Sequence, residues 1–295
     1  FKRFADIDAW PICLDTTDVD EIVRTVELIA PGFGGINLED IAAPRCFEVE
    51  ARLRERLSIP VFHDDQHGTA IVVLAALTNA LRCVDKKLPD ARILVSGGGA
   101  AGSAIVQLLL AAGAVDVTVY DRPGLLHRDD ESLTPAWRSL AEQTNPRGLR
   151  GTLRDGLQGA DVFIGVSAPR ILEPAWLHDM AERRIVFALA NPDPEIDIYE
   201  ATQHATVVAS GRSDYPNQIN NVLAFPGVFR GLLDARATDV TTEMLIRAAE
   251  AIASVVTDEQ LNPNYIIPSV FQPDMSKTVA KAIVDCVSTA PTAGP

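Results

Sequence analysis

The amino-acid sequence predicts an α/β protein built on parallel sheets, in two parts and with a helical tail. Three observations support this fold class. Short apolar runs alternate with amphipathic segments of helical period in the first third of the chain. A glycine-rich turn then separates an apolar run from a helical segment, and further apolar runs follow it. The region after residue 221 has the apolar spacing of amphipathic helices.

Size and charge limit the class of protein. The chain has 295 residues with 47% hydrophobic content, which is enough for a large core, and 40 acidic residues against 26 basic ones. The resulting net charge of −14 argues against DNA or RNA as a partner. No apolar run approaches the roughly 18 to 20 residues that span a bilayer, so we expect no membrane association.

The first residue and the cysteines indicate the cellular context. Phe1 is neither a methionine nor the start of a basic, signal-like segment, so we expect the chain to be part of a longer protein. The four cysteines lie far apart and form no Cys-x-x-Cys pair, which predicts neither a zinc ribbon nor a disulfide framework. The cysteine pattern favours the reducing cytoplasm as the location.

Three apolar runs in the first third of the chain have the pattern of strands that each end in a carboxylate: "WPICLD", "FGGINLED" and "IPVFHDD". Amphipathic helices are predicted between them, the first with Asp18 and Glu21 at the spacing of a capping box. Parallel strands end at one edge of a sheet, where ligands bind in open α/β folds, so we expect the acids to converge there. These acids are Asp15, Glu39, Asp40, Asp64 and Asp65.

The adjacent carboxylates Asp64 and Asp65 repel each other at the end of an apolar strand, and they require a cation or proton in compensation. Sites with oxygen ligands alone suit Mg²⁺ or Mn²⁺. His63 and His67 bracket the pair and could form a zinc site, but the segment ends a strand and no helix is predicted across both. We therefore interpret the histidines as structural or supporting groups.

The second part is predicted to begin after Gly68, which divides the chain into residues 1–68 and 69–295. It opens with "TAIVVLAALTNALRCV", which is apolar nearly all round and predicts a long buried helix. A strand is predicted at Ile93–Val95, a helix at Ser103–Ala112 and a second strand at Val115–Tyr120. Further strands are predicted at "ADVFIGVSA", "RIVFALANP" and "ATVVASG". This order is that of a Rossmann-type domain with C-terminal helices.

A G-x-G-x-x-G turn joins the first strand and helix of this domain, and Asp121 ends the following strand. In this context the motif strongly predicts a dinucleotide site, because the glycines admit the pyrophosphate and the acid accepts hydrogen bonds from the ribose. Asp121 favours NAD, whereas Arg122 could pair with the 2′-phosphate of NADP. The predicted turn residues are Gly97, Gly99, Ala100, Ala101 and Gly102.

Three asparagines follow apolar stretches on the cofactor side of the chain: Asn191 in "ALANPDPE", and Asn220 and Asn221 in "QINNVLAFPG". Asparagine often only forms a turn or a cap. Uncharged amides near a cofactor can also bind a carboxylate substrate, although this signal is weak when taken alone.

Together, "GGINLEDI", "PVFHDDQHGTA", "SGGGAAGSA", "ALANPDPE" and "NQINNVLAFPGVFRG" closely resemble the malic enzymes, in particular the shorter bacterial type. The resemblance covers nearly the whole chain from about Phe4. It implies oxidative decarboxylation of L-malate to pyruvate and CO₂ with reduction of NAD⁺ or NADP⁺, a divalent metal and a homodimer. It also implies a general-base lysine and a general-acid tyrosine upstream of Phe1, because Lys2 does not match that lysine.

The resemblance also assigns roles to residues of this chain. Glu39, Asp40 and Asp65 match the metal ligands, and Asp64 matches a neighbouring acid in proton transfer. Asn191 and Asn221 match malate-binding amides, with Asn220 beside them, and the glycine turn with Asp121 matches the dinucleotide site. Two alternatives remain open from the sequence: a catalytically inactive nucleotide-binding module, and a metal-independent NAD(P) dehydrogenase that acts on another hydroxy acid.

Overall fold

The computed structural model describes residues 1–289 and confirms the α/β class with parallel sheets. A two-stranded parallel sheet joins β1 (Ile36–Leu38) and β2 (Val61–His63). A six-stranded sheet has the order β5-β4-β3-β6-β7-β8 and is parallel except for β5. Its strands are β3 (Arg92–Ser96), β4 (Asp116–Asp121), β5 (Gly124–Leu125), β6 (Val162–Gly165), β7 (Ile185–Ala188) and β8 (Val207–Ser210).

The small sheet is covered by the two helices that the sequence predicts around it. Asp18 caps the first of them by accepting a hydrogen bond from the Glu21 N–H at 2.9 Å, although its own N–H is bound by Thr16 Oγ1 and no reciprocal box closes. Apolar side chains of both helices pack with Leu38 and Val61 of the strands in a separate core. The helices are α2 (Val19–Ile29) and α3 (Arg45–Arg56).

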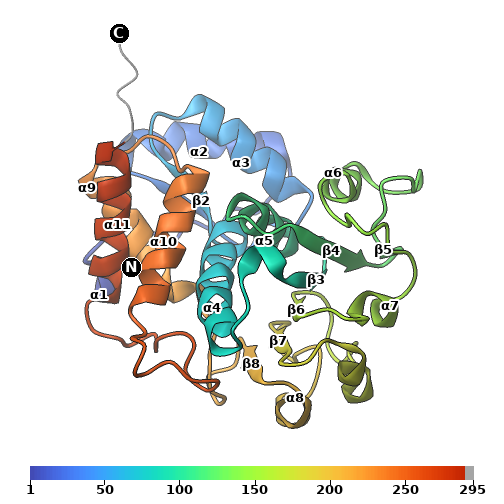
Figure 1. Cartoon of the computed structure of the whole chain (residues 1–295). Coiled ribbons are helices and arrows are strands. Elements are labelled where there is room, and N and C mark those ends of the chain that lie inside the picture. The colour runs from blue at the N-terminus through green and yellow to red at the C-terminus, as the bar shows by residue number, and fades with distance from the viewer. Residues whose placement is uncertain (290–295) are drawn as a thin grey trace.

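A long central helix connects the two parts of the molecule. It packs against the helix after the glycine turn and against α10 of the C-terminal helices, as Figure 1 shows, and its side chains from Ala70 to Leu77 are all buried. The uniformly apolar sequence of this segment is thereby explained, because it faces protein on every side. The elements concerned are α4 (Thr69–Cys83), α5 (Ala100–Ala111), α9 (Phe225–Asp234), α10 (Thr242–Ser254) and α11 (Met275–Thr289).

The remaining helices are short and lie at the periphery. The side chains of α6 belong to the same core cluster as those of α5, whereas α7 and α8 pack on the other face of the large sheet (Figure 1). They are α1 (Lys2–Ala5), α6 (Pro135–Gln143), α7 (Leu153–Leu157) and α8 (Ile198–His204). Across residues 1–289, each helix is too short or too polar to cross a membrane.

One predicted strand is wrong. Residues 10–15 form no regular secondary structure and pair with no strand within the described part of the chain, and Trp10 and Ile12 are 74% and 50% exposed. An apolar run becomes a strand only where a neighbour takes its backbone hydrogen bonds, and Pro11 has no N–H to offer. Asp15 follows no strand, so the prediction that it lies with the other acids at the edge of a parallel sheet does not hold.

Candidate active site

The first group of predicted site residues gathers where β1 and β2 end. Leu38 pairs with His63 across the parallel ladder, so Glu39 and Asp64 follow neighbouring positions at the same edge. Glu39 and Asp40 line a cavity of about 670 Å³ together with Asn37 and apolar side chains of the N-terminal segment. The sequence argument for a shared sheet edge is confirmed for these two strands.

The next residues bring the two acidic pairs into direct contact. Asp40 has a left-handed backbone, with a φ of 58°, which aspartate tolerates better than most residues. In this conformation its N–H donates a hydrogen bond of 2.8 Å to Asp65 Oδ2. The acids predicted from segments 25 positions apart are therefore neighbours.

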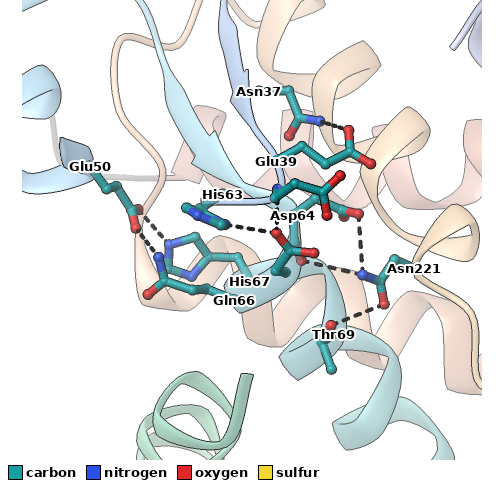
Figure 2. Close-up of polar contacts among 11 residues, drawn as sticks. Asn37, Glu39, Glu50, His63, Asp64, Gln66, His67, Thr69 and Asn221 are labelled. Carbon is teal, nitrogen blue, oxygen red and sulfur yellow. Dashed lines mark hydrogen bonds and ion pairs between the residues drawn. The ribbon is translucent and has the colours of Figure 1, made fainter. Parts of the chain in front are cut away.

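Asp64 links this edge to the second part of the chain (Figure 2). Asn221 donates from Nδ2 to Asp64 Oδ2 at 3.2 Å, and Thr69 donates from Oγ1 to Asn221 Oδ1 at 3.2 Å. Asn221 begins a single 3-10 turn before α9, whereas Thr69 begins α4. Residues 157 positions apart thus form one hydrogen-bonded group with the acids.

Burial changes the charge state of Asp64, which is only 5% exposed. Its burial raises the pKa to about 7, while the hydrogen bond from Asn221 lowers it and repulsion from Glu39 and Asp65 raises it further. Partial loss of hydration, followed by repulsion from Asp65 and Asp40, also raises the pKa of Glu39. Burial is thus the main cause of both raised pKa values, and repulsion among the neighbouring carboxylates adds to it.

The donor set fits a hard divalent cation by its chemistry. Asp64 Oδ1 is buried without a hydrogen-bond partner, and the neighbouring groups are carboxylate oxygens, which Mg²⁺ and Mn²⁺ prefer. In the arrangement seen for residues 1–289, however, no three acidic, histidine or cysteine side chains converge closely enough to hold an ion. One oxygen of Asp65 is instead occupied by the Asp40 N–H.

The two histidines of this segment face different acids. His63 is fully buried, and burial lowers its pKa, so the imidazole is kept neutral 3.8 Å from Asp65 Oδ2. His67 Nε2 lies 2.5 Å from Glu50 Oε1 on α3, and Gln66 donates to the other oxygen of that carboxylate. The two neighbouring rings therefore face different carboxylates (Figure 2), as the supporting interpretation expects and a shared zinc site does not.

The glycine turn has the geometry that a dinucleotide site needs. Gly97 has a φ of 112°, which L side chains rarely adopt, and a Cβ at Gly102 would lie 1.7 Å from the Gly97 carbonyl oxygen. Gly99 is the N-cap residue of α5, so Ala100 and Ala101 form its first turn with their N–H groups at the sheet edge.

Asp121 closes this turn from the end of β4. Its Oδ2 accepts a hydrogen bond of 2.6 Å from the Gly98 N–H, and its Oδ1 accepts one of 2.7 Å from the Arg122 N–H. The Asp121 side chain, which is predicted to bind the ribose, therefore contacts the glycine turn. Arg122 is exposed beside it.

The asparagines separate into two kinds. Asn220 is a cap, because its Oδ1 accepts the Val222 N–H at 3.0 Å. Asn191 is exposed three residues after β7 and lies against Gly211, which follows β8. Within the described residues its side chain makes no hydrogen bond to the acids or to Asn221. Of the three predicted amides, the structure thus brings only Asn221 to the carboxylates.

Sequence reasoning missed three residues near these sites. Thr69 orients Asn221, Trp137 of α6 lies against Gly98 at the glycine turn, and Glu195 is fully buried behind the ends of β6 and β7. Glu195 had no usable signal, since it is one of three acids at alternate positions, with Asp193 and Asp197, in the loop that follows β7. For all three residues the partners lie far away in the sequence.

Comparison with known proteins identifies two family domains in the chain. Residues 66–288 match the family described as malic enzyme, NAD binding domain, and residues 15–54 match malic enzyme, N-terminal domain. The first match covers most of the chain and contains the glycine turn, Asp121 and the three asparagines. The second contains Glu39 and Asp40.

Individual relatives agree with this assignment. An NAD-dependent malic enzyme of Geobacillus stearothermophilus is 58% identical over 97% of this chain, and a bifunctional malic/malolactic enzyme of Bacillus subtilis is 49% identical over 96%. This chain spans 60% and 70% of their lengths. The crystal structure of an NAD-dependent malic enzyme from Thermotoga maritima superposes with a TM-score of 0.92 at 47% identity, covering 96% of this chain and 75% of its own. The chain belongs to the malic enzyme family.

Proposed function

We propose that this chain carries the metal-, cofactor- and substrate-binding residues of an enzyme that oxidatively decarboxylates L-malate to pyruvate and CO₂ with reduction of NAD⁺ or NADP⁺. The observation that carries the proposal is the hydrogen bond from Asn221 to Asp64, which joins an amide of the second part to the acidic edge of the first. Membership of the malic enzyme family supports it.

Glu39, Asp40 and Asp65 would hold Mg²⁺ or Mn²⁺ between the ends of β1 and β2. When bound, such an ion supplies Lewis-acid stabilisation of the negative charge that develops as CO₂ leaves. The raised pKa of Glu39 supports this assignment, because a cation relieves the repulsion among these carboxylates.

Asp64 is the proton-transfer group in this proposal. With its pKa raised to about 7 by burial, the carboxyl can hold or release a proton near neutral pH. Asn221 donates to the same carboxylate and is itself held by Thr69, so the acid and the amide keep a fixed orientation. Asn221 and Asn191 would bind the malate carboxylates, with Asn220 contributing its amide nitrogen.

The dinucleotide would lie over the glycine turn with its pyrophosphate at the start of α5. Asp121, which accepts the Gly98 N–H of that turn, would accept the ribose hydroxyls and repel a 2′-phosphate, which favours NAD⁺ over NADP⁺. The NAD-dependent relative is consistent with this preference.

The metal assignment is tested by calorimetric titration of Mn²⁺ into the protein and into Asp65→Ala. We expect the variant to lose at least about ten-fold in affinity, because a charged ligand is removed. Asp129→Ala is the matched control, since that carboxylate is exposed beside Arg150 on the other part of the molecule. Equal Mn²⁺ affinity in the parent and in Asp65→Ala would remove the metal site.

The substrate assignment is tested with malate, or with the non-reacting analogue tartronate, titrated into protein loaded with Mn²⁺ and NAD⁺. Asn221→Ala and Asn191→Ala each remove a hydrogen bond to a charged group, worth roughly 1.5 to 3 kcal/mol, so affinity should fall about ten- to hundred-fold. NAD⁺ affinity should barely change. A parent protein that binds NAD⁺ but no malate would favour the alternative of a nucleotide-binding module without catalysis.

The assembly and location of the protein are further parts of the proposal. The family resemblance leads us to expect a homodimer. The cysteine usage leads us to expect a cytoplasmic location. Light scattering coupled to size-exclusion chromatography tests the dimer directly, and a mass of a single chain across the accessible concentration range would reject it.

A further inference from the structure

Glu195 is a buried charge for which the proposed reaction has no use. It lies in the loop after β7 and is 0% exposed. Its Oε1 accepts a hydrogen bond of 2.9 Å from the Ser167 N–H, and its Oε2 accepts one of 3.1 Å from the Ala190 N–H. One carboxylate therefore connects the loop after β6 with the end of β7.

The last residue of β6 leaves room for the Glu195 side chain. A Cβ added at Gly165, the last residue of β6, would lie 2.4 Å from Glu195 Cδ. Burial raises the pKa of Glu195, whereas the hydrogen bonds from backbone N–H groups lower it. Burying this carboxylate carries a desolvation penalty that an apolar side chain would avoid. We therefore interpret Glu195 as a residue whose hydrogen bonds hold the backbone of the two loops in place.

The backbone of the same loop adds further links. The Leu172 N–H donates to the Glu195 carbonyl oxygen at 3.0 Å, and the Arg170 N–H donates to the Pro194 carbonyl oxygen at 3.0 Å. The loops after β6 and β7 are therefore bound to each other through side chain and backbone together.

The connection continues to the glycine turn. Ser167 Oγ lies 3.0 Å from Ser96 Oγ, and Ser96 immediately precedes Gly97. In the sheet, β4 lies on one side of β3 and β6 lies on the other. The strand order therefore reverses between β3 and β6, and ligands bind at such a switch point in open α/β sheets. Glu195 thus joins the loops after β6 and β7 at the edge where cofactor and substrate would meet, and Ser167 separately contacts the residue before the glycine turn.

We propose that Glu195 is a positioning residue that fixes the spacing between the loop at Ser167, on the nicotinamide side of the cofactor site, and the loop that carries Asn191. This inference rests on the proposed function. The role of Glu195 differs from a general structural one because both backbone N–H groups that it binds lie at the sheet edge where ligands would bind. The adenosine half of the cofactor, held at Gly97 and Asp121, does not depend on it.

The test compares NAD⁺ with ADP-ribose, which lacks the nicotinamide, by calorimetric titration into the parent and into Glu195→Gln. Glutamine has nearly the same shape but places an N–H₂ donor against one backbone N–H, so one link is lost. We expect NAD⁺ affinity to fall about ten-fold while ADP-ribose affinity stays within about two-fold of the parent. In turnover by the full-length enzyme, we expect kcat to fall more than the KM for NAD⁺ rises.

Asp161→Asn is the matched control. Asp161 also accepts a backbone N–H, from Arg92 at 2.8 Å, and pairs with Lys86 at 2.6 Å, but it lies at the opposite, amino edge of β3 and β6. We expect this variant to bind both ligands as the parent does. Glu195→Asp keeps the charge but shortens the side chain so that it cannot reach both the Ser167 and the Ala190 N–H groups. It should likewise reduce NAD⁺ affinity alone, and it serves if Glu195→Gln does not fold.

Two results would overturn the inference. Equal losses of NAD⁺ and ADP-ribose affinity in Glu195→Gln would reduce Glu195 to a general structural role, and unchanged NAD⁺ affinity would remove any role in positioning. The proposed function fails in a different way, through a parent protein that binds neither NAD⁺ nor Mn²⁺.

Discussion

Asp121 shows how a single side chain can serve both its own turn and a ligand. Both of its oxygens accept backbone N–H groups, one of them from Gly98 in the glycine turn. Each carboxylate oxygen has a further lone pair, so a ribose hydroxyl can still donate to it.

We predict that Asp121→Ala weakens NAD⁺ binding about ten-fold or more, because a hydrogen bond to a charged acceptor is worth roughly 1.5 to 3 kcal/mol. NADP⁺ binding should weaken much less, since the carboxylate repels its 2′-phosphate and this repulsion is also removed. Titration of both cofactors, with Asp129→Ala as control, measures the difference. Equal weakening of both cofactors would mean that Asp121 does not distinguish the ribose from its 2′-phosphate.

The pKa of Asp64 leads to a prediction about stability in the absence of metal. The folded pKa of about 7 lies above the ordinary value of 3.8, so the protonated form is favoured by folding. Its contribution is fully present below pH 3.8 and is lost as pH rises through about 7. The difference corresponds to a loss on the order of 4 kcal/mol at alkaline pH.

Asp64→Asn should therefore become more stable relative to the parent as pH rises from about 4 to about 8. Urea unfolding in the presence of EDTA, at several pH values, gives the two free energies of unfolding. The exposed change Asp129→Asn should leave the pH dependence unaltered. A constant difference between Asp64→Asn and the parent across this range would mean that the carboxyl is not desolvated in the folded protein.

At the scale of elements, two glycines of the glycine turn have different roles, one in the fold and one in ligand binding. A Cβ at Gly102 would collide with the Gly97 carbonyl oxygen at 1.7 Å, whereas a Cβ at Gly99 meets nothing within 4 Å. Gly102 is thus required by the approach of α5 to the turn after β3. Gly99 is free of such contacts and faces the predicted pyrophosphate position.

We predict that Gly102→Ala lowers the melting temperature by several degrees, because the turn or α5 must shift, and that it also weakens NAD⁺ binding. Gly99→Ala should melt as the parent does and yet lose NAD⁺ affinity. Thermal unfolding and NAD⁺ titration of both variants provide the comparison. If Gly99→Ala kept parental NAD⁺ affinity, the pyrophosphate would have to lie elsewhere.

At the scale of the whole molecule, α4 is joined to the C-terminal helices by one buried amide. Asn79 is 0% exposed and donates to the carbonyl oxygens of Ala253 and Ile266 at 3.0 and 2.9 Å, while its Oδ1 accepts from Arg82. These bonds connect the central helix with the end of α10 and with the segment that precedes α11.

Asn79→Ala should reduce the free energy of unfolding by about 2 to 4 kcal/mol, because two buried carbonyl groups lose their donor and a small cavity forms. Urea unfolding followed by circular dichroism measures this change. Asn264→Ala, at an exposed position, should differ from the parent by less than about 0.5 kcal/mol. A loss of that small size in Asn79→Ala would show that water replaces the missing donor.

The sequence by itself determined the features that depend on neighbouring residues. Apolar period and turn residues were enough to predict β1 through β4, the helices between them, the buried character of α4 and the glycine turn. The carboxylates that end β1 and β2 were predicted at one edge because parallel strands share their direction. Each of these signals is contained within a short stretch of chain.

Only the tertiary structure decided which of these candidates meet. The sequence could not distinguish Asn221, which reaches Asp64, from Asn220, which caps a turn, because the partner lies 157 positions away. It also gave no sign that residues 10–15 would lack a neighbouring strand. Pairing, burial and the resulting pKa of Asp64 depend on contacts between distant segments, and local sequence carries no information about the desolvation that those contacts impose.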